Sequence, residues 1–444
     1  MRFGIKSQRV VREEGVGPAT VVIEDGRIRD VVVGDVGSLV LQDVGARAVS
    51  PGIVDSHVHL NEPGRSDWEG FAHGTRAAAA GGVTTLVDMP LNSIPVTTDA
   101  SALQQKVAAS EGQRWVDLGF WGGVVPHNLG ELEGLAAGGA LGCKTFLTHS
   151  GIDEFPNTTG ADLRQAMPIL RASGLPLLVH AELESGAAVH ETDRRKYQHY
   201  LESRPRAWED DAIRLIVELV RETGCHAHIV HLSSASSLET LRRAKDDGLP
   251  ISAETCPHYL CLEAEQIPDG ATQFKCAPPI RERENRELLW RGLFDGVIDF
   301  VVTDHSPCTP ALKRMDVGEF DLAWGGIASL SMGLGAVWTE ASRRGATLQQ
   351  LARWMSAGPA TLAGLRHKGR LARGFDADLV VWEPETEFEV SEERLFTRHP
   401  LSPYLKRRLL GSVQETFVRG QRVFADGRHV DTPFGLGLLH RGTR

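Results

Sequence analysis

Between residues 51 and 365 the chain repeats one pattern, a short apolar run followed by a segment with helical periodicity. Parallel strands joined by crossover helices give this alternation, because each strand needs a long connection before the next one can lie beside it. Eight runs follow the pattern, and they occupy residues 52–60, 84–90, 116–124, 142–147, 176–182, 227–233, 251–258 and 298–306. Eight parallel strands can close into a barrel. The sequence therefore predicts an α/β fold, a TIM-like (β/α)8 barrel over residues 51–365.

The clearest helix among the connections is predicted over residues 210–224. Its apolar residues Ile213, Ile216, Leu219 and Val220 fall on one face of a helix, and Gly224 supplies a stop signal. We expect this face to pack against the barrel strands.

The two ends of the chain have a different character. Residues 1–50 and 366–444 alternate apolar and polar residues between turn signals, and Asp25-Gly26 separates two β-branched runs as a tight hairpin does. Each end alone has too few strands to be stable. We therefore predict that both ends pair into one small β-sandwich domain, with a C-terminal tail, beside the barrel domain of residues 51–365.

Charge and apolar content narrow the classes of partner. The formal net charge is −10 with both signs interspersed, which gives no basic surface for nucleic acid. No run reaches the roughly 18 to 20 apolar residues of a membrane span, and the first residues lack the apolar core of a signal peptide. The six cysteines form no CxxC pair, so reduced thiols are expected. These features favour a cytoplasmic protein with a small-molecule partner and no membrane or nucleic-acid partner.

Reactive side chains stand near the carboxyl ends of the predicted barrel strands, where barrel enzymes carry their active sites. They are His57, His59, Lys144, His180, His231 and Asp304. A lone histidine at a strand end is usually a hydrogen-bonded structural residue, and an HxH pair alone is weak evidence. Four histidines and a carboxylate at one end of a barrel, however, form the ligand set of a metal centre.

Lys144 needs a separate explanation, because an ammonium beside divalent cations would be repelled. Reaction with carbon dioxide would convert its amine into an anionic carbamate with two oxygen ligands. A buried lysine paired with an acid is the alternative that the residues leave open.

Several motifs in order then resemble the amidohydrolase superfamily, in its cyclic amidase branch of allantoinases, hydantoinases and dihydroorotases. They include PGIVDSHVHLNEPGRSDWEGF, GCKTFLTHSGIDEFP, LVHAE, IVHLSSASSL, SAETCPHYL, KCAPPIRE, VVTDHSPC and GRLARGFDADLVVW, and they run from about Val49 to Trp382. The resemblance implies two divalent metal ions per chain, with zinc as the default and cobalt or manganese as alternatives. It also implies a homotetramer.

The resemblance assigns a role to each of the six residues. His57 and His59 would bind the more buried metal, and His180 and His231 the more exposed one. Lys144, carboxylated by carbon dioxide, would bridge the two. Asp304 would be a further ligand and the general base that carries a proton from the attacking hydroxide to the leaving nitrogen. No metal position is missing, which argues against a non-catalytic relative.

Two positions in the sequence narrow the choice among the substrates of this family. Asn61 stands where dihydroorotases usually carry an arginine for a substrate carboxylate, and His149 stands where hydantoinases and dihydropyrimidinases tend to carry a tyrosine. HSGIDEFP and DHSPC resemble the allantoinases, so we predict hydrolysis of the hydantoin ring of allantoin to allantoate, with a hydantoinase or dihydropyrimidinase as the alternative. Candidate substrate contacts, by position in the family, are Asn61, Asn92, His149, Cys276 and Gly325.

Overall fold

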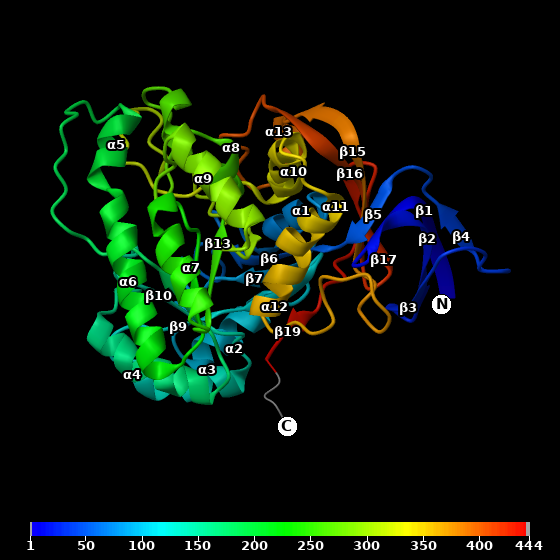
Figure 1. Cartoon of the computed structure of the whole chain (residues 1–444), viewed down its shortest axis with the longest axis horizontal. Helices are drawn as coiled ribbons and strands as arrows, with labels where there is room; N and C mark the ends of the chain where they lie inside the picture. Colours follow the sequence, from blue (N-terminus) through cyan, green and yellow to red (C-terminus); the bar gives the residue numbers. More distant parts are fainter. Residues whose placement is uncertain (1, 441–444) are drawn as a thin grey trace.

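The computed structural model describes residues 2–440 and divides visibly into two parts (Figure 1). The larger part is a ring of strands surrounded by helices, and the smaller is an all-β part that contains the N-terminus. Within the described residues, no helix combines the length and apolar character needed to cross a membrane.

The strands of the larger part lie within the eight predicted runs, except that β7 begins one residue before its run. They are β6 (Ile53–Val58), β7 (Val83–Asp88), β8 (Asp117–Phe120), β9 (Gly122–Gly123), β10 (Cys143–Phe146), β11 (Leu177–His180), β12 (Ala227–Ile229), β13 (Ile251–Thr255) and β14 (Phe300–Val301). β8 and β9 are two halves of the third predicted strand, and neighbouring strands pair in parallel. Val58 pairs with His305 after β14, and the N–H of His59 donates to the His305 carbonyl at 2.8 Å. This contact closes the ring, and the predicted barrel is confirmed.

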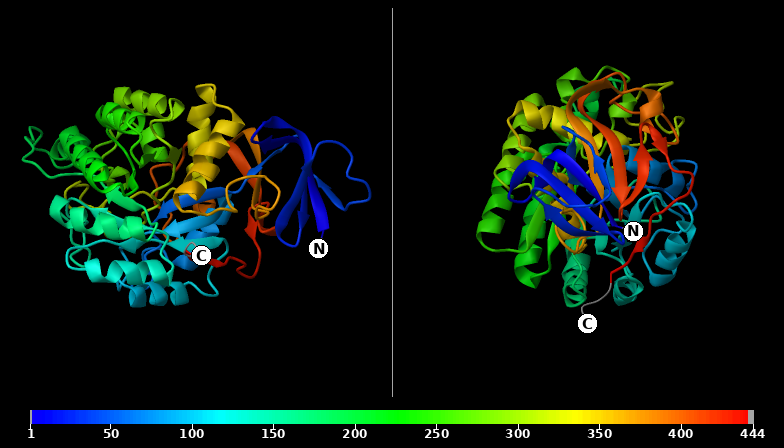
Figure 2. Two further views of the ribbon diagram at one scale, coloured as in Figure 1. Left: turned by 60° about the horizontal axis from the view of Figure 1, so that its bottom comes forward. Right: turned by 90° about the vertical axis from the view of Figure 1, so that its right-hand side faces the viewer.

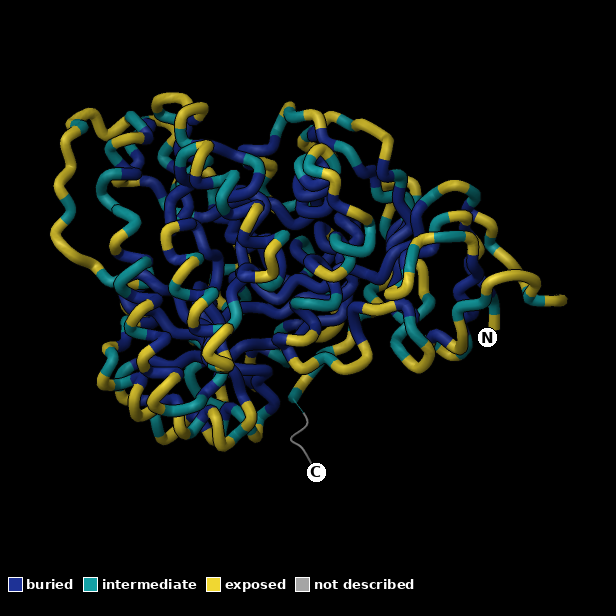
Figure 3. The backbone as a smooth tube through the Cα atoms, in the orientation of Figure 1, coloured by how far each residue is buried: buried dark blue, intermediate teal, exposed yellow. Residues whose placement is uncertain are grey.

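Side chains of the barrel strands alternate between two cores. Leu178 lies in the core inside the ring, whereas Leu177 and Val179 on either side of it belong to the core under the helices. The barrel strands are buried along almost their whole length, and Figure 3 shows buried chain through the middle of the larger part with exposed segments around it. Because the period is two, His180 has the same parity as Leu178 and faces inward.

Helices cover the outside of the ring. They are α1 (Phe71–Ala80), α2 (Ala100–Ala109), α3 (Leu132–Gly138), α4 (Gly160–Ala172), α5 (Tyr197–Ser203), α6 (Arg206–Thr223), α7 (Leu238–Asp246), α8 (Pro257–Cys261), α9 (Arg283–Phe294), α10 (Gly333–Arg343), α11 (Leu348–Ala352) and α12 (Gly358–Leu362). In α6 the four predicted core residues are buried, and Gly224 ends the helix with a φ of 65°. The prediction for this helix is confirmed, with a start four residues earlier than expected.

The small part is built from both chain ends. Its strands are β1 (Arg2–Arg12), β2 (Gly15–Glu24), β3 (Arg27–Val32), β4 (Leu41–Asp43), β5 (Ala48–Pro51), β15 (Leu379–Glu389), β16 (Arg408–Val418), β17 (Gln421–Ala425) and β18 (Arg428–His429), with the short helix α13 (Glu392–Leu395) after β15. β5 pairs with β1 on one side and with β15 on the other, which joins the two ends into one sheet. The right-hand view of Figure 2 shows the blue and orange strands side by side.

This sheet folds over a core of its own. Ile5, Val21 and Val49 from the N-terminal strands pack in one cluster with Leu379 and Phe417 from the C-terminal strands. The structure thus gives the small β-sandwich that was predicted from the pairing of both ends. The domain division at 50/51 and 365/366 remains our proposal.

A buried ionic cluster connects the barrel, the small part and the C-terminal tail. The Lys368 ammonium lies 2.5 Å from Asp117 at the start of β8, 2.7 Å from Asp378 and 3.0 Å from Asp376. Asp117 also accepts from the N–H of Leu436, just before β19 (Gly437–Leu438), which pairs with β8. The tail therefore adds a strand to the barrel sheet, which the sequence did not predict.

We expect Lys368→Met to lower the free energy of unfolding by about 3 to 5 kcal/mol, because it leaves the buried Asp378 without its cation, although Arg419 still pairs with Asp117. Lys6→Met is the matched control, since Lys6 forms an exposed ion pair with Asp43 at 3.4 Å and should change stability by less than about 1 kcal/mol. Denaturant unfolding of both variants measures the difference. Equal effects would mean that the cluster contributes no more than a surface pair.

Candidate active site

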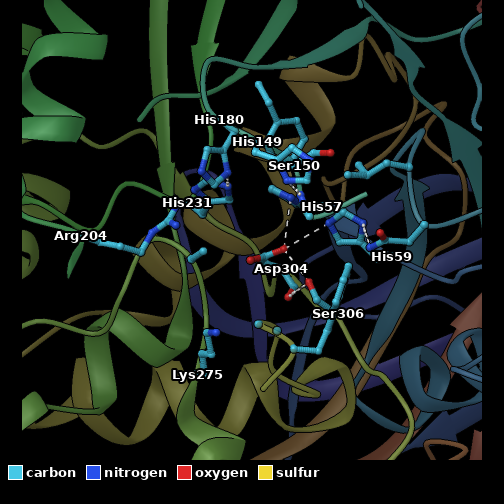
Figure 4. Close-up of a pocket in the computed structure, with 18 of the residues that line it drawn as sticks. His57, His59, His149, Ser150, His180, Arg204, His231, Lys275, Asp304 and Ser306 are labelled. Carbon is cyan, nitrogen blue, oxygen red and sulfur yellow. Dashed lines mark hydrogen bonds and ion pairs between the residues drawn. The ribbon is translucent and has the colours of Figure 1, made fainter. Parts of the chain in front are cut away.

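One pocket collects the six residues singled out from the sequence. All six line it, five of them at or just beyond the carboxyl ends of barrel strands and Lys144 within β10: His57, His59, Lys144, His180, His231 and Asp304. In Figure 4 the Asp304 carboxylate lies in the centre, with His57 and His59 on one side and His180 and His231 on the other. The inward parity of the strands explains this convergence.

The first half of the site consists of His57, His59 and Asp304. The Nε2 atoms of His57 and His59 lie 3.2 and 3.5 Å from Oδ1 of Asp304. The three possible ligand atoms lie within 4.8 Å of one another, and all three residues are buried. Two imidazoles and one carboxylate at this spacing suit a divalent transition metal.

The second half contains polar atoms that are buried without a partner. Nδ1 of His180 lies 3.0 Å from Nε2 of His231. The Nζ of Lys144 and the Nδ1 of His231 have no hydrogen-bond partner among the described residues. Buried polar atoms are rarely left unsatisfied unless an ion or a water belongs there. The donor set therefore fits a metal centre.

The backbone at two of these residues is unusual. His231 lies two residues after the end of β12 and has a φ of 39°. Asp304 lies three residues after the end of β14 and has a φ of 45°. Residues other than glycine seldom adopt the left-handed region, and such conformations concentrate at functional sites. Here they turn the chain at the strand ends and direct both side chains into the pocket.

Two glutamates that the sequence analysis missed hold the imidazoles. Oε1 of Glu254 in β13 lies 2.5 Å from Nδ1 of His57, and its Oε2 lies 3.0 Å from Nε2 of His228. Glu182 accepts from Nε2 of His180 at 2.6 Å. Carboxylates of this kind fix the orientation of metal-binding histidines. The only sequence signal was their place in the LVHAE and SAETCPHYL motifs.

Burial sets the protonation of the ligand candidates. It lowers the pKa of His57, His180 and His231, which favours the neutral imidazoles that metals bind. It also lowers the pKa of Lys144 to about 7, so that a neutral amine is available. Burial favours the protonated form of Asp304, but the nearby His57 and His59 outweigh it and hold its pKa well below the ordinary value.

The structure separates the five predicted substrate contacts. Asn92, His149 and Gly325 line the pocket. Asn61 lies outside the lining and donates to the Pro307 carbonyl at 3.3 Å. Cys276 also lies outside the lining, although its neighbour Ala277 is part of it.

Other side chains on the wall were not anticipated. Besides Phe146 of β10, those with polar groups or aromatic rings are Ser150, Tyr200, Arg204, Lys275, Ser306 and Trp324. They come from connections between strands, where spacing along the sequence gives no indication of position. In Figure 4 Arg204 and Lys275 lie on the side of Asp304 away from His59.

Comparison with known proteins gives relatives over the whole chain. The sequence profile of the amidohydrolase family matches residues 48–423. The chain is 46% identical to "Allantoinase" of Arabidopsis thaliana and 45% identical to "Probable allantoinase" of Oryza sativa subsp. japonica, in each case over 98% of this chain and 90% of the relative. The structure resembles the L-hydantoinase (dihydropyrimidinase) from Arthrobacter aurescens with a TM-score of 0.91 and 28% identity, over 99% of this chain and 100% of that one.

Proposed function

The chain belongs to the amidohydrolase family, and from this premise we propose that it hydrolyses the ring amide of allantoin to give allantoate. The observation that carries the proposal is the convergence of six ligand candidates on one buried pocket, in a chain whose relatives at 45–46% identity are named allantoinases.

The residues divide into two groups that would hold two divalent ions, which we propose to be zinc, with cobalt or manganese able to use the same donors. His57 and His59 would hold one ion, and His180 and His231 the other, with Asp304 as a further ligand. Divalent ions bound there supply Lewis acidity toward the amide carbonyl and lower the pKa of water.

Lys144 would bridge the two positions after reaction with carbon dioxide. Burial lowers the pKa of its amine to about 7, so a neutral fraction is present at neutral pH. A neutral amine adds to the carbon of carbon dioxide, forms an N–C bond and releases one proton. The product is an anion with two oxygens, which removes the charge conflict of an ammonium in a cluster of metal ligands.

Asp304 would move the proton during hydrolysis. Its carboxylate accepts a hydrogen bond from the Ser306 hydroxyl at 2.9 Å, which orients it in the centre of the pocket. A carboxylate in this position can take a proton from the attacking water and deliver it to the leaving nitrogen. The six residues thus have complementary tasks in opening the ring to a carboxylate. A homotetramer remains part of this proposal.

Steady-state hydrolysis of allantoin, hydantoin, dihydrouracil and dihydroorotate tests the proposal on one zinc-reconstituted sample of known metal content. We expect fast turnover of allantoin and little of the other three. Fast turnover of hydantoin with slow turnover of allantoin would favour the second candidate, a hydantoinase, for which the likeness to the A. aurescens structure is the supporting observation. An inert protein without metal would contradict both.

A further inference from the structure

Four lysines are buried within residues 2–440, and they differ in how their charge is matched. Lys106 lies 2.6 Å from Asp88, and Lys368 lies in its cluster of aspartates. Lys144 belongs to the active site. Lys313 is only 4% exposed and has no carboxylate within ion-pair distance among the described residues. Burying an ammonium without a counter-ion is unfavourable, so its position calls for an explanation.

Lys313 donates instead to backbone carbonyls of one pocket loop. Its Nζ lies 3.0 Å from the carbonyl oxygen of Trp324 and also contacts that of Gly326. Trp324, Gly325 and Gly326 line the active-site pocket. The ammonium therefore lies behind the wall of the pocket and acts on it through the main chain.

The carbonyl of Trp324 and the N–H of Gly325 belong to the same peptide bond. A cation bound to the carbonyl oxygen draws electrons from the amide and makes its N–H a stronger donor, as in a polarised chain of hydrogen bonds. Within residues 2–440, the Gly325 N–H donates to no other group. Gly325 lies on the pocket wall, and no partner within the described part of the protein competes with a substrate oxygen for this N–H.

Ring opening creates an oxygen that needs such a donor. Water adds to the ring carbonyl carbon, the C–N bond breaks, and its electron pair goes to nitrogen. That nitrogen is joined to a urea carbonyl, so the negative charge spreads onto the urea oxygen until a proton reaches the nitrogen. A hydrogen bond to this oxygen becomes stronger as the negative charge on it grows. Such a donor therefore stabilises the transition state more than the bound substrate.

We propose that Lys313 is a positioning residue that polarises the Trp324–Gly325 peptide bond, so that the Gly325 N–H stabilises the urea oxygen of the leaving group. This inference rests on the proposed function, because it requires a ring amide whose leaving nitrogen carries a carbonyl.

A second lysine that donates to a carbonyl of the same loop provides a matched control. Lys275 donates to the Ala323 carbonyl at 2.7 Å. The N–H of that peptide bond belongs to Trp324, and it donates to the Leu312 carbonyl at 2.8 Å, not to the pocket. Lys275 and Lys313 thus both anchor the loop, but only Lys313 acts on the peptide bond of Gly325.

The test compares Lys313→Met and Lys275→Met with the wild type, each loaded to the same metal content. For Lys313→Met we expect kcat for allantoin to fall by about tenfold to a hundredfold while KM stays within about twofold, because a transition-state interaction weakens. Lys275 itself lines the pocket, so we expect the main effect of Lys275→Met to be on KM. Similar losses of kcat in both variants would mean that the lysines only anchor the loop, and the proposal would be overturned.

Lys313→Gln separates charge from hydrogen bonding and replaces the methionine variant if that variant does not fold. An amide can still donate to a loop carbonyl but carries no charge, so we expect the same loss of kcat. Wild-type kcat in Lys313→Gln would overturn the proposal. If the wild type opens another ring amide instead of allantoin, the proposed function fails, and the variants are then compared on that substrate.

Discussion

Replacing Lys144 with alanine is expected to abolish allantoin turnover and to lower the metal bound per chain. Polarisation by metal ions contributes several kcal/mol to catalysis, and each 1.4 kcal/mol corresponds to about a factor of ten, so the loss should be at least roughly a thousandfold. Lys144 is fully buried, and its Nζ has no hydrogen-bond partner among the described residues. Its removal therefore breaks no ion pair, and the fold should survive.

Steady-state rates and elemental analysis of the same samples measure both effects. Short carboxylic acids added with metal should partly restore activity, because they can supply the two oxygens that the carbamate would have provided. Lys106→Met is a comparison outside the pocket lining, and it should keep normal metal content per folded chain even though it leaves the buried Asp88 without its cation and lowers stability. Normal turnover and normal metal content in Lys144→Ala would show that the bridging role is wrong.

The barrel and the side chains at its reactive end could be predicted from the sequence, because both depend on the two-residue alternation of side chains along a β-strand. In β10, Lys144 and Phe146 line the pocket. Cys143 packs in the outer core, between the ring of strands and the helices. Once the strands are placed, the parity decides which side chains can meet. The hairpin at Asp25-Gly26 was equally accessible, because a positive φ at both residues is what such a turn requires.

Several pocket residues on the connections between strands escaped prediction for a physical reason. Arg204 follows α5 and reaches Glu182 across 22 residues of chain, and Lys275 and Lys313 meet on one loop although 38 positions separate them. No periodicity relates such positions, so only the folded chain brings them together. The pairing of β19 with β8 was missed for the same reason, since a two-residue strand has no periodic pattern.

Asp304→Asn is expected to lower turnover of allantoin by about a hundredfold to ten-thousandfold, the range that general acid–base catalysis contributes. An asparagine keeps the size of the side chain and one oxygen toward His57 and His59, but its amide cannot accept and return a proton. The hydroxyl of Ser306 can still donate to that oxygen, so the side chain should keep its orientation. We therefore expect a large loss of kcat with a small change in thermal stability.

Metal content decides which of the two proposed roles of Asp304 accounts for this loss. Retained metal with low kcat would assign the loss to proton transfer, whereas depleted metal would assign it to the ligand role. Ser306→Ala provides a graded control, because it leaves the carboxylate intact and removes only the hydrogen bond that orients it, and it should lower kcat by about tenfold or less. An unchanged rate in Asp304→Asn would remove Asp304 as the base, and the proton would then have to travel through another group in the pocket.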